Sequence, residues 1–228
     1  LEGLEFRIQV SPLDCTGCGN CADICPAKEK ALVMVKAEEE IERQKENWEY
    51  VVNNVTYKDD LMAKTTLKGS QFAKPLLEFH GACAGCGESA YLILATQLFG
   101  DRMMIANATG CSSIWGASAP SIPYTVNHEG KGPSWGNSLF EDNAEYGLGM
   151  YIAVKQIREK IKDLMIKGIR ANISEECSEI FKEWIHNMYD GEKSKEISKN
   201  LINLLDRGEY RHNEIIQKIL KRKSKNSR

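Results

Sequence analysis

Apolar residues recur every three or four positions through the second half of the chain. From Asn143 onward they fall on one face of four successive stretches, a spacing typical of amphipathic helices. The apolar positions are Met150, Val154, Ile157, Ile161 and Leu164; Ile180, Phe181, Trp184 and Met188; Ile197, Leu201, Leu204 and Leu205; and Ile215, Ile216 and Ile219. The pattern predicts four helices that pack together through these faces.

The middle of the chain alternates between strand-like and helix-like runs. Residues 75–79 are apolar, and residues 88–99 form a helix-length apolar stretch that ends at Gly100. Residues 103–106 are a short strand candidate that runs into a turn at Thr109. This β–α alternation is typical of a parallel sheet. Glycine and proline then punctuate residues 120–136, which we expect to be a loop.

The first third of the chain has a different character. Two short apolar runs, one at Phe6, Ile8 and Val10 and the other over residues 31–35, predict strands on either side of a cysteine-rich loop. Residues 37–70 are rich in charge and predict a linker. We therefore expect a small α+β unit at 1–36, a linker at 37–70 and a second domain at 71–228.

Composition narrows the class of protein only modestly. The chain has 228 residues, of which 42% are hydrophobic and 27% charged, as in ordinary globular proteins. No apolar run approaches the roughly 18 residues that would span a membrane. The formal net charge of -2 gives no electrostatic case for nucleic-acid binding, although five of the last eight residues are basic and are expected to fray in solvent.

The cysteines carry most of the chemical information. There are eight, and four of them, Cys15, Cys18, Cys21 and Cys25, lie within eleven residues. No secretory signal precedes them, so we interpret them as thiolate ligands in a reducing compartment and not as a disulfide framework. The spacing C-x2-C-x2-C-x3-C-P is that of bacterial ferredoxins, in which the fourth cysteine ligates a second cluster. The alternative, a zinc site, usually pairs two separated C-x-x-C units.

A second group of cysteines follows in the middle of the chain. Cys83 and Cys86 lie in a glycine-rich loop, and Cys111 lies in the turn after the predicted strand. Three thiolates that converge in this way predict a metal site with one ligand from elsewhere. Iron-sulfur and zinc both remain open at this point, as does a redox-active C-x-x-C pair. The eighth cysteine, Cys177, falls on the apolar face of a predicted helix and is expected in the core.

Four blocks of this sequence together resemble one enzyme family, the pyruvate:ferredoxin (flavodoxin) oxidoreductases. The blocks are residues 11–26, 81–88, 109–115 and 132–149. The resemblance implies an enzyme that converts pyruvate and coenzyme A to acetyl-CoA and CO2. It also implies thiamine diphosphate with magnesium, 4Fe-4S clusters, and ferredoxin or flavodoxin as the electron acceptor. The implied fold is a ferredoxin-like α+β unit followed by an incomplete α/β thiamine diphosphate-binding domain with helical additions.

The resemblance also implies roles for individual residues. Cys83, Cys86 and Cys111 correspond to ligands of the cluster nearest the thiamine, and Glu88 and Cys111 to residues beside the thiamine diphosphate. The first cysteine motif divides between two relay clusters. Cys15, Cys18 and Cys21 correspond to ligands of one, and Cys25 to a ligand of the other.

Parts of the family pattern are missing from this sequence. These are the GDGxxYDIG motif that holds magnesium and diphosphate, the fourth ligand of the thiamine-proximal cluster, and the domains that hold pyruvate. We therefore expect an internal fragment, inactive alone, of a homodimeric cytoplasmic enzyme or one from an organelle of an anaerobic eukaryote. The alternatives are an oxidoreductase for another 2-oxo acid, a stand-alone iron-sulfur electron carrier, or a zinc-stabilised binding module.

Overall fold

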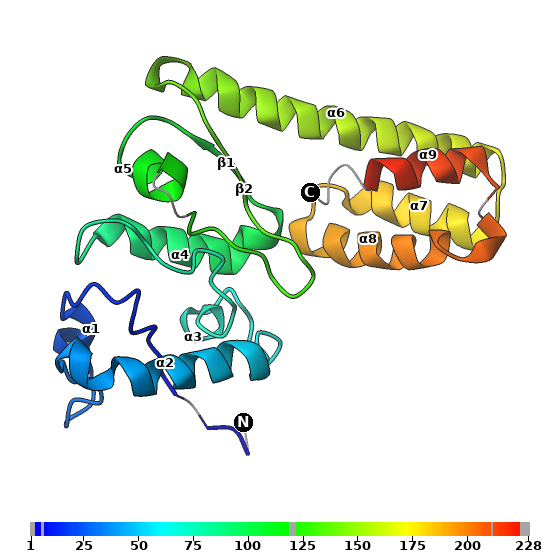
Figure 1. Ribbon diagram of the computed structural model, residues 1–228. Coiled ribbons are helices and arrows are strands. Elements are labelled where there is room, and N and C mark those ends of the chain that lie inside the picture. The colour runs from blue at the N-terminus through cyan, green and yellow to red at the C-terminus, as the bar shows by residue number, and fades with distance from the viewer. Residues whose placement is uncertain (1–2, 6, 119–121, 211, 224–228) are drawn as a thin grey trace. The chain divides into compact units, whose positions relative to one another are not determined.

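The computed structural model divides the chain into two compact units, residues 1–140 and 141–228 (Figure 1). It describes residues 3–5, 7–118, 122–210 and 212–223. The domain boundaries predicted from composition stay a prediction.

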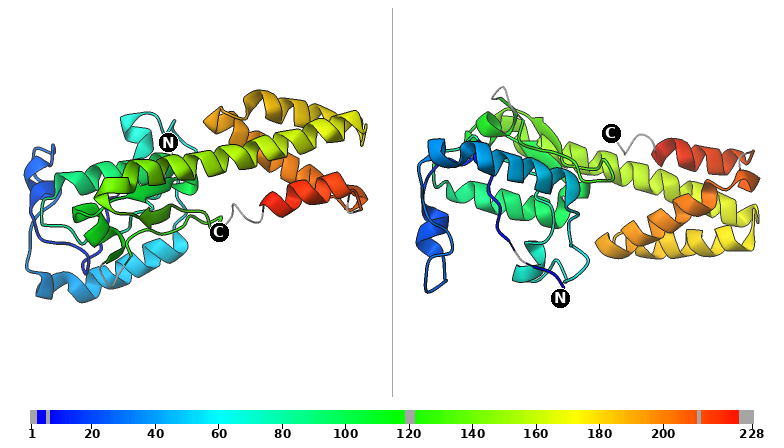
Figure 2. Two further views of the ribbon diagram at one scale, coloured as in Figure 1. Left: turned by 90° about the horizontal axis from the view of Figure 1, so that it is seen from above. Right: turned by 60° about the horizontal axis from the view of Figure 1, so that its bottom comes forward.

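The second unit is a helical bundle built from the four predicted stretches. Its helices are α6 (Asn143–Arg170), α7 (Glu175–Asn187), α8 (Gly191–Leu205) and α9 (Glu214–Lys223). Helix α6 packs against α7 and α9, and α7 packs against α8, as the two views of Figure 2 also show. All four helices were predicted from the helical spacing of apolar residues, so the local sequence pattern is sufficient to locate them. The basic residues at 224–228 lie outside the described residues.

The core of this bundle consists of the apolar faces expected from the sequence. Phe181, Ile216, Met165 and Cys177 are fully buried, which confirms Cys177 as a core residue. Where α6 crosses α7 the helices approach closely, because Gly168 faces the ring of Phe181. The indole N–H of Trp184 donates to Ser198 Oγ at 3.0 Å, so the polar atom of this buried ring is satisfied.

Polar side chains cap the N-termini of two helices of the bundle. Ser174 caps α7 by accepting a hydrogen bond from the backbone N–H of Cys177 at 3.1 Å, and its hydroxyl also contacts Tyr210 Oη at 3.1 Å. Asp190 caps α8 by accepting from Lys193 N at 3.0 Å. These residues satisfy backbone donors that a helix N-terminus otherwise leaves without partners.

The first unit is built around a small parallel sheet and helices. Strand β1 (Met104–Asn107) pairs with β2 (Ser134–Asn137), in the register Met104↔Ser134 to Asn107↔Asn137. The connection between the strands contains α5 (Cys111–Ser113) and the π-helix η2 (Ile114–Ser118). Strand β1 was predicted, whereas β2 begins within the stretch expected to be a loop. Its sequence, Ser-Trp-Gly-Asn, lacks the β-branched residues that mark most strands.

The remaining elements of this unit are helices α1 (Asn20–Ile24), α2 (Ala37–Asn54), α3 (Leu67–Ser70) and α4 (Gly87–Phe99), with the short 3-10 segment η1 (Gly100–Arg102). A further 3-10 segment, η3 (Phe140–Asp142), begins at its last residue. The predicted helix at 88–99 is thus confirmed. Much of the expected linker forms the 18-residue helix α2, whose first turn holds three glutamates that favour the positive end of the helix dipole. The two-stranded sheet and the helices of this unit together fit the α+β class expected for the start of the chain.

Two predicted strands do not form. Residues 7–10 and 31–36 have no strand structure, and Phe6 lies outside the described residues. Neither run finds a partner strand for its backbone groups in the described chain, and a lone strand is not stable. Their side chains stay accessible, with Val33 71% and Ile8 55% exposed. Nor do the helices of the described chain include one that could cross a membrane, given their length and polarity.

Candidate functional site

The first cysteine motif folds as a loop that leads into helix α1. Gly19 precedes this helix in the left-handed conformation, with φ of 81°, and its carbonyl accepts from the backbone N–H groups of Ala22 and Asp23 at 3.0 Å. Glycine adopts this conformation without a steric cost, so the chain can turn sharply between Cys18 and Cys21. Cys15, Cys18 and Cys21 are all exposed free thiols.

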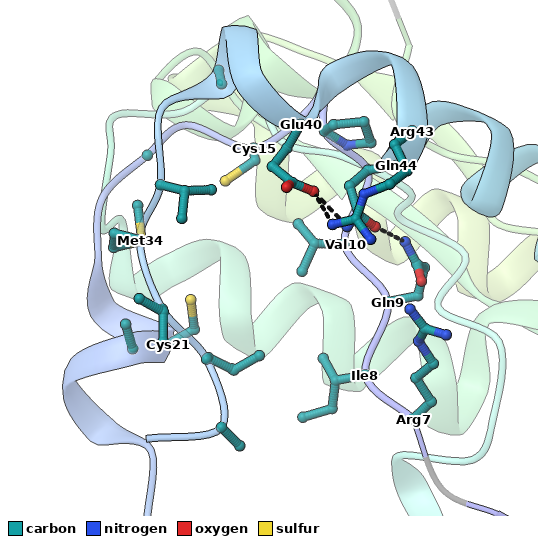
Figure 3. A pocket seen from close by; sticks show the side chains of 18 residues that line it. Arg7, Ile8, Gln9, Val10, Cys15, Cys21, Met34, Glu40, Arg43 and Gln44 are labelled. Atoms are coloured by element: carbon teal, nitrogen blue, oxygen red, sulfur yellow. Dashed lines mark hydrogen bonds and ion pairs between the residues drawn. The ribbon is translucent and has the colours of Figure 1, made fainter. Parts of the chain in front are cut away.

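A cavity of about 460 Å³ opens beside this loop, and Cys15 and Cys21 both line it (Figure 3). Its other lining residues are largely apolar and come from the two runs that failed to form strands, among them Ile8, Val10 and Met34. Helix α2 closes one wall, where Gln44 Nε2 donates to Glu40 Oε2 at 3.0 Å and Gln9 Nε2 donates to Gln44 Oε1 at 3.2 Å. The cavity thus combines sulfur donors with apolar walls.

Backbone N–H groups favour the ionised form of Cys18. The N–H of Asn20 has the largest effect and lowers the pKa of the Cys18 thiol, although desolvation opposes it. The hydroxyl of Thr16 and the N–H of Gly85 lower this pKa further. Donors of this kind also stabilise thiolates that ligate metal clusters, because they bond to the sulfur without displacing the metal.

The pKa of the Cys25 thiol is also lowered. The backbone N–H of Ala27 is the main cause, followed by that of Ala31. The charge of Lys30 contributes less; its ammonium group donates to the carbonyl of Cys25 at 3.3 Å. Cys25 therefore has its own set of donors, separate from those of Cys18.

The second cysteine loop is a tight turn at the N-terminus of α4. The backbone N–H of Cys86 donates to the carbonyl of Cys83 at 3.1 Å, and Gly85 between them has a φ of +72°. A positive φ at the third position of such a turn is typical of type II, which glycine favours. Cys83 is exposed, Cys86 is partly buried, and Ser89 Oγ donates to the Cys86 carbonyl at 2.9 Å.

Glu88 lies in the first turn of α4, directly after this loop. It is close enough to Tyr124 that its charge, together with the larger effect of burial, raises the pKa of the Tyr124 phenol. Gly116 approaches both the Tyr124 ring and the indole nitrogen of Trp135. Glu88 is thus placed near an aromatic part of the unit.

Among the described residues of this part of the chain, three buried side-chain nitrogen atoms have no hydrogen-bond partner. They are Nε1 of Trp115, Nε1 of Trp135 and Nδ1 of His80. Trp115 packs against Gly81, at the start of the second cysteine loop. Buried indole N–H groups usually find a partner, so these atoms mark positions where a ligand or another part of a protein could bind.

Cys111 begins helix α5 just beyond the carboxyl end of β1 and is exposed. Asn107, the last residue of β1, holds this turn, because its Oδ1 accepts from Ser112 Oγ at 3.1 Å. Asn107 Nδ2 also lies 3.4 Å from Oδ1 of Asn137, the last residue of β2. Ligands of open parallel sheets bind at this carboxyl edge. Sequence analysis missed Asn107 and Asn137, although a polar residue at the end of a strand is a usable signal.

The predicted cysteine ligands are not grouped into a metal-binding site among the described residues. Within the ranges described above, no three His, Cys, Asp or Glu side chains are grouped so that they could hold a metal ion. The structure does bring the first and second cysteine loops next to each other, at Cys18, Asn20 and Gly85. The sulfur-lined cavity and the N–H donors fit a cluster with thiolate ligands, so the ligand assignments stay predictions that the local chemistry favours.

Comparison with known proteins bears on the same residues. Residues 8–28 match the family model described as 4Fe-4S binding domain, which supports iron-sulfur over zinc for the first motif. The chain is 54% identical to a pyruvate-flavodoxin oxidoreductase of Klebsiella pneumoniae over 86% of its own length and 17% of that protein. It is 53% identical to the pyruvate:ferredoxin oxidoreductase of Moorella thermoacetica over 89% of its length and 17% of the relative.

A further relative, 45% identical over 88% of this chain and 11% of its own length, is the pyruvate dehydrogenase [NADP(+)] of Cryptosporidium parvum. These relatives confirm the resemblance to pyruvate:ferredoxin (flavodoxin) oxidoreductase drawn from the sequence blocks. The chain spans less than a fifth of the length of each of them.

Proposed function

We propose that this chain forms part of an oxidoreductase that oxidatively decarboxylates pyruvate with coenzyme A to acetyl-CoA and CO2. The electrons would pass to ferredoxin or flavodoxin through 4Fe-4S clusters. The observation that carries the proposal is the pair of adjoining cysteine loops in a chain whose relatives bear these names. Two neighbouring thiolate sites suit electron transfer between clusters. A structural zinc site would not serve this purpose, because zinc has no redox chemistry.

The chain's own residues would supply ligands and surroundings for the bound groups. Cys15, Cys18 and Cys21 would hold one relay cluster, and Cys25 would hold another together with ligands from elsewhere. The N–H groups that lower the pKa of Cys18 and Cys25 favour the thiolate form, which is the form that binds iron. The cavity beside Cys15 and Cys21 would supply apolar surroundings for the first of these sites.

Cys83, Cys86 and Cys111 would hold a cluster next to the thiamine diphosphate, and Glu88 would contact that cofactor. Thiamine diphosphate, when bound with magnesium, would supply the carbon chemistry of the decarboxylation. Glu88 would orient the cofactor, and the unpartnered indole nitrogens of Trp115 and Trp135 lie in the region that would form its pocket wall. Asn107 would hold the turn that presents Cys111.

A segment exchange tests this proposal directly. The matching segment of the Moorella thermoacetica relative is replaced by this chain, and pyruvate-dependent reduction of a viologen dye is measured with coenzyme A present. We expect the hybrid to be active and its Cys111→Ala variant to lose almost all activity. Cys177→Ala is the matched control, because this core thiol lies among no predicted ligands, and it should retain activity.

An inactive hybrid that folds and loads iron would contradict the proposal, as would an active Cys111→Ala hybrid. The chain by itself should reduce no dye with pyruvate, because it spans less than a fifth of the length of its relatives. Exchange of the 2-oxo acid in the same assay tests the alternative of another substrate: faster turnover of a different 2-oxo acid would replace pyruvate in the proposal.

A further inference from the structure

Two polar side chains are buried near the end of helix α4. Residues 92–95 are apolar, and Thr96 and Gln97 follow them with only 2% and 8% of their surface exposed. Burying a polar group is unfavourable unless it finds a hydrogen-bond partner. Both side chains find partners on residues 73–78, the approach segment, which leads into the second cysteine loop. Thr96 and Gln97 therefore join the helix after the loop to the segment before it.

The partners of these side chains are buried backbone groups. The N–H of Leu76 donates to Thr96 Oγ1 at 3.1 Å, and Thr96 Oγ1 donates to the carbonyl of Ile93 at 2.8 Å. Gln97 Nε2 donates to the carbonyl of Ala73 at 3.0 Å. Ala73 and Leu76 are both buried, so loss of either side-chain polar atom would leave a buried backbone group short of a hydrogen bond.

A second set of contacts holds the approach segment in place. The backbone N–H of Glu78 donates to the carbonyl of Pro123 at 3.0 Å, and the N–H of Thr125 donates to the carbonyl of Leu76 at 3.1 Å. Gly100, directly after α4, lies so close to Leu76 that a Cβ there would stand 2.8 Å from Leu76 Cδ1. The approach segment is thus fixed against both the helix and a neighbouring segment.

We propose that Thr96 and Gln97 are positioning residues that clasp the base of the second cysteine loop, and so fix where Cys83, Cys86 and Glu88 lie. Their two hydrogen bonds close a ring of chain that contains all three of these residues. Within the proposed function, on which this inference rests, the clasp sets the position of two cluster ligands relative to the residue beside the thiamine diphosphate.

The polar atoms add a fixed register to the apolar packing. An α-helix turns by about 100° per residue, so a slip of one residue in α4 would carry Thr96 and Gln97 away from the approach segment. Apolar side chains would tolerate such a slip better, because the hydrophobic effect has no direction. Cys86 caps the N-terminus of the same helix and Glu88 lies in its first turn, so both would move with it.

The clasp is tested first in the cluster-free chain, by amide exchange measured with NMR. Thr96→Val keeps the shape of the side chain but removes the hydroxyl, whereas Thr96→Ser keeps the hydroxyl. We expect the Leu76 amide to exchange about tenfold faster in Thr96→Val, because its buried N–H loses its acceptor. The Cys86 amide, which donates to the Cys83 carbonyl within the loop, should also exchange faster. Thr96→Ser should retain the wild-type rates.

Thr125→Val is the matched control for this test. Thr125 pairs with Leu76 through its backbone N–H, which the substitution keeps, so the Cys86 amide should exchange as in the wild type. Faster exchange at Leu76 together with unchanged exchange at Cys86 in Thr96→Val would overturn the inference. In that case the hydroxyl would hold the approach segment without positioning the loop.

A second variant covers the case in which Thr96→Val does not fold. Gln97→Met keeps the length of the side chain but removes the donor to the Ala73 carbonyl. It should also speed exchange of the Cys86 amide, because it opens the same clasp. Equal rates at Cys86 in Gln97→Met and the wild type would again overturn the inference.

Low-temperature EPR of the hybrid with the Moorella thermoacetica relative tests the position of the loop within the proposed function. We expect Thr96→Val to weaken the cluster signal that Cys111→Ala removes, to leave the signal that Cys15→Ala removes, and Thr96→Ser to restore the first signal. Equal effects on both signals, including no effect on either, would overturn the positioning role. If the exchange tests succeed and the hybrid binds no iron, the clasp stands and the proposed function fails.

Discussion

The close approach of helices α6 and α7 gives a quantitative prediction for Gly168→Ala. A Cβ at this position would stand 2.8 Å from Cε2 of Phe181 and 3.4 Å from Cδ2 of the same ring. It would also stand 3.4 Å from Cδ1 of Ile173. The Phe181 ring is fully buried in the bundle core, so it has no free space into which it could retreat. The added methyl group must therefore displace the helix or the ring.

Two opposing effects set the size of the change. Inserting a methyl group into a packed core costs about 1 to 3 kcal/mol. Alanine in place of glycine in a helix contributes about 0.8 to 1 kcal/mol in the other direction. Gly149, in the same helix, has no atom within 4 Å of its Cβ position. Gly149→Ala should therefore gain stability, and Gly168→Ala should be less stable than Gly149→Ala by about 1 to 3 kcal/mol.

Hydrogen exchange with peptide resolution is the suitable assay, because the chain has two compact units and a single unfolding curve would mix them. Opening free energies are measured for peptides from α7 and α8 in the wild type and both variants. If Gly168→Ala raised these free energies as much as Gly149→Ala, the close contact with Phe181 would be refuted.

Three further predictions concern single groups. Ser174→Ala should destabilise α7 by about 1 to 3 kcal/mol, since it removes the helix cap and a partner of the Tyr210 hydroxyl. Hydrogen exchange of peptides from α7 at increasing urea concentration measures the change in opening free energy, and a loss below about 0.5 kcal/mol would contradict the prediction. In the cluster-free chain, alkylation of Cys18 and Cys25 should reach its half-maximal rate at a lower pH than in the urea-unfolded chain, because folding lowers the pKa of both thiols. The stability that these shifts give the folded chain is fully present above the ordinary thiol pKa of about 8.5, and it is lost as the pH falls through the lowered pKa values of the folded state. Coincident profiles for the folded and unfolded chains would refute this. Asn107→Ala should speed amide exchange over residues 108–113 and leave α4 unchanged, because it removes the acceptor for Ser112; uniform exchange across both segments would indicate general destabilisation instead.

The helical bundle could be predicted from the sequence because its information is local. Positions such as Ile197, Leu201 and Leu204 follow the helical period, and burying them needs only neighbouring helices of the same chain. Cys177 was placed in the core by the same pattern. Capping by Ser174 is also local, since the hydroxyl reaches a backbone N–H three residues along.

The first unit was harder to predict because its pairings are distant in sequence. Strand β2 pairs with β1 across about thirty residues, and its Gly136 and Asn137 disfavour a strand although Trp135 favours one. The run that ends at Val10 alternates like a strand, and residues 31–35 are continuously apolar, yet residues 7–10 and 31–35 form no strand because neither run has a partner strand among the described residues. The contact of Gly85 with Asn20 is likewise invisible in spacing, although both cysteine motifs were found.

The central claim is that the two adjoining cysteine loops hold iron-sulfur clusters. The most direct test is to purify the chain anaerobically, quantify iron, sulfide and zinc per mole, and record a low-temperature EPR spectrum after reduction. We expect iron and sulfide in matching amounts and the signal of a reduced 4Fe-4S cluster, with Cys18→Ala lowering both and Cys177→Ala leaving them unchanged. Stoichiometric zinc without sulfide would contradict the claim and would favour a structural metal module.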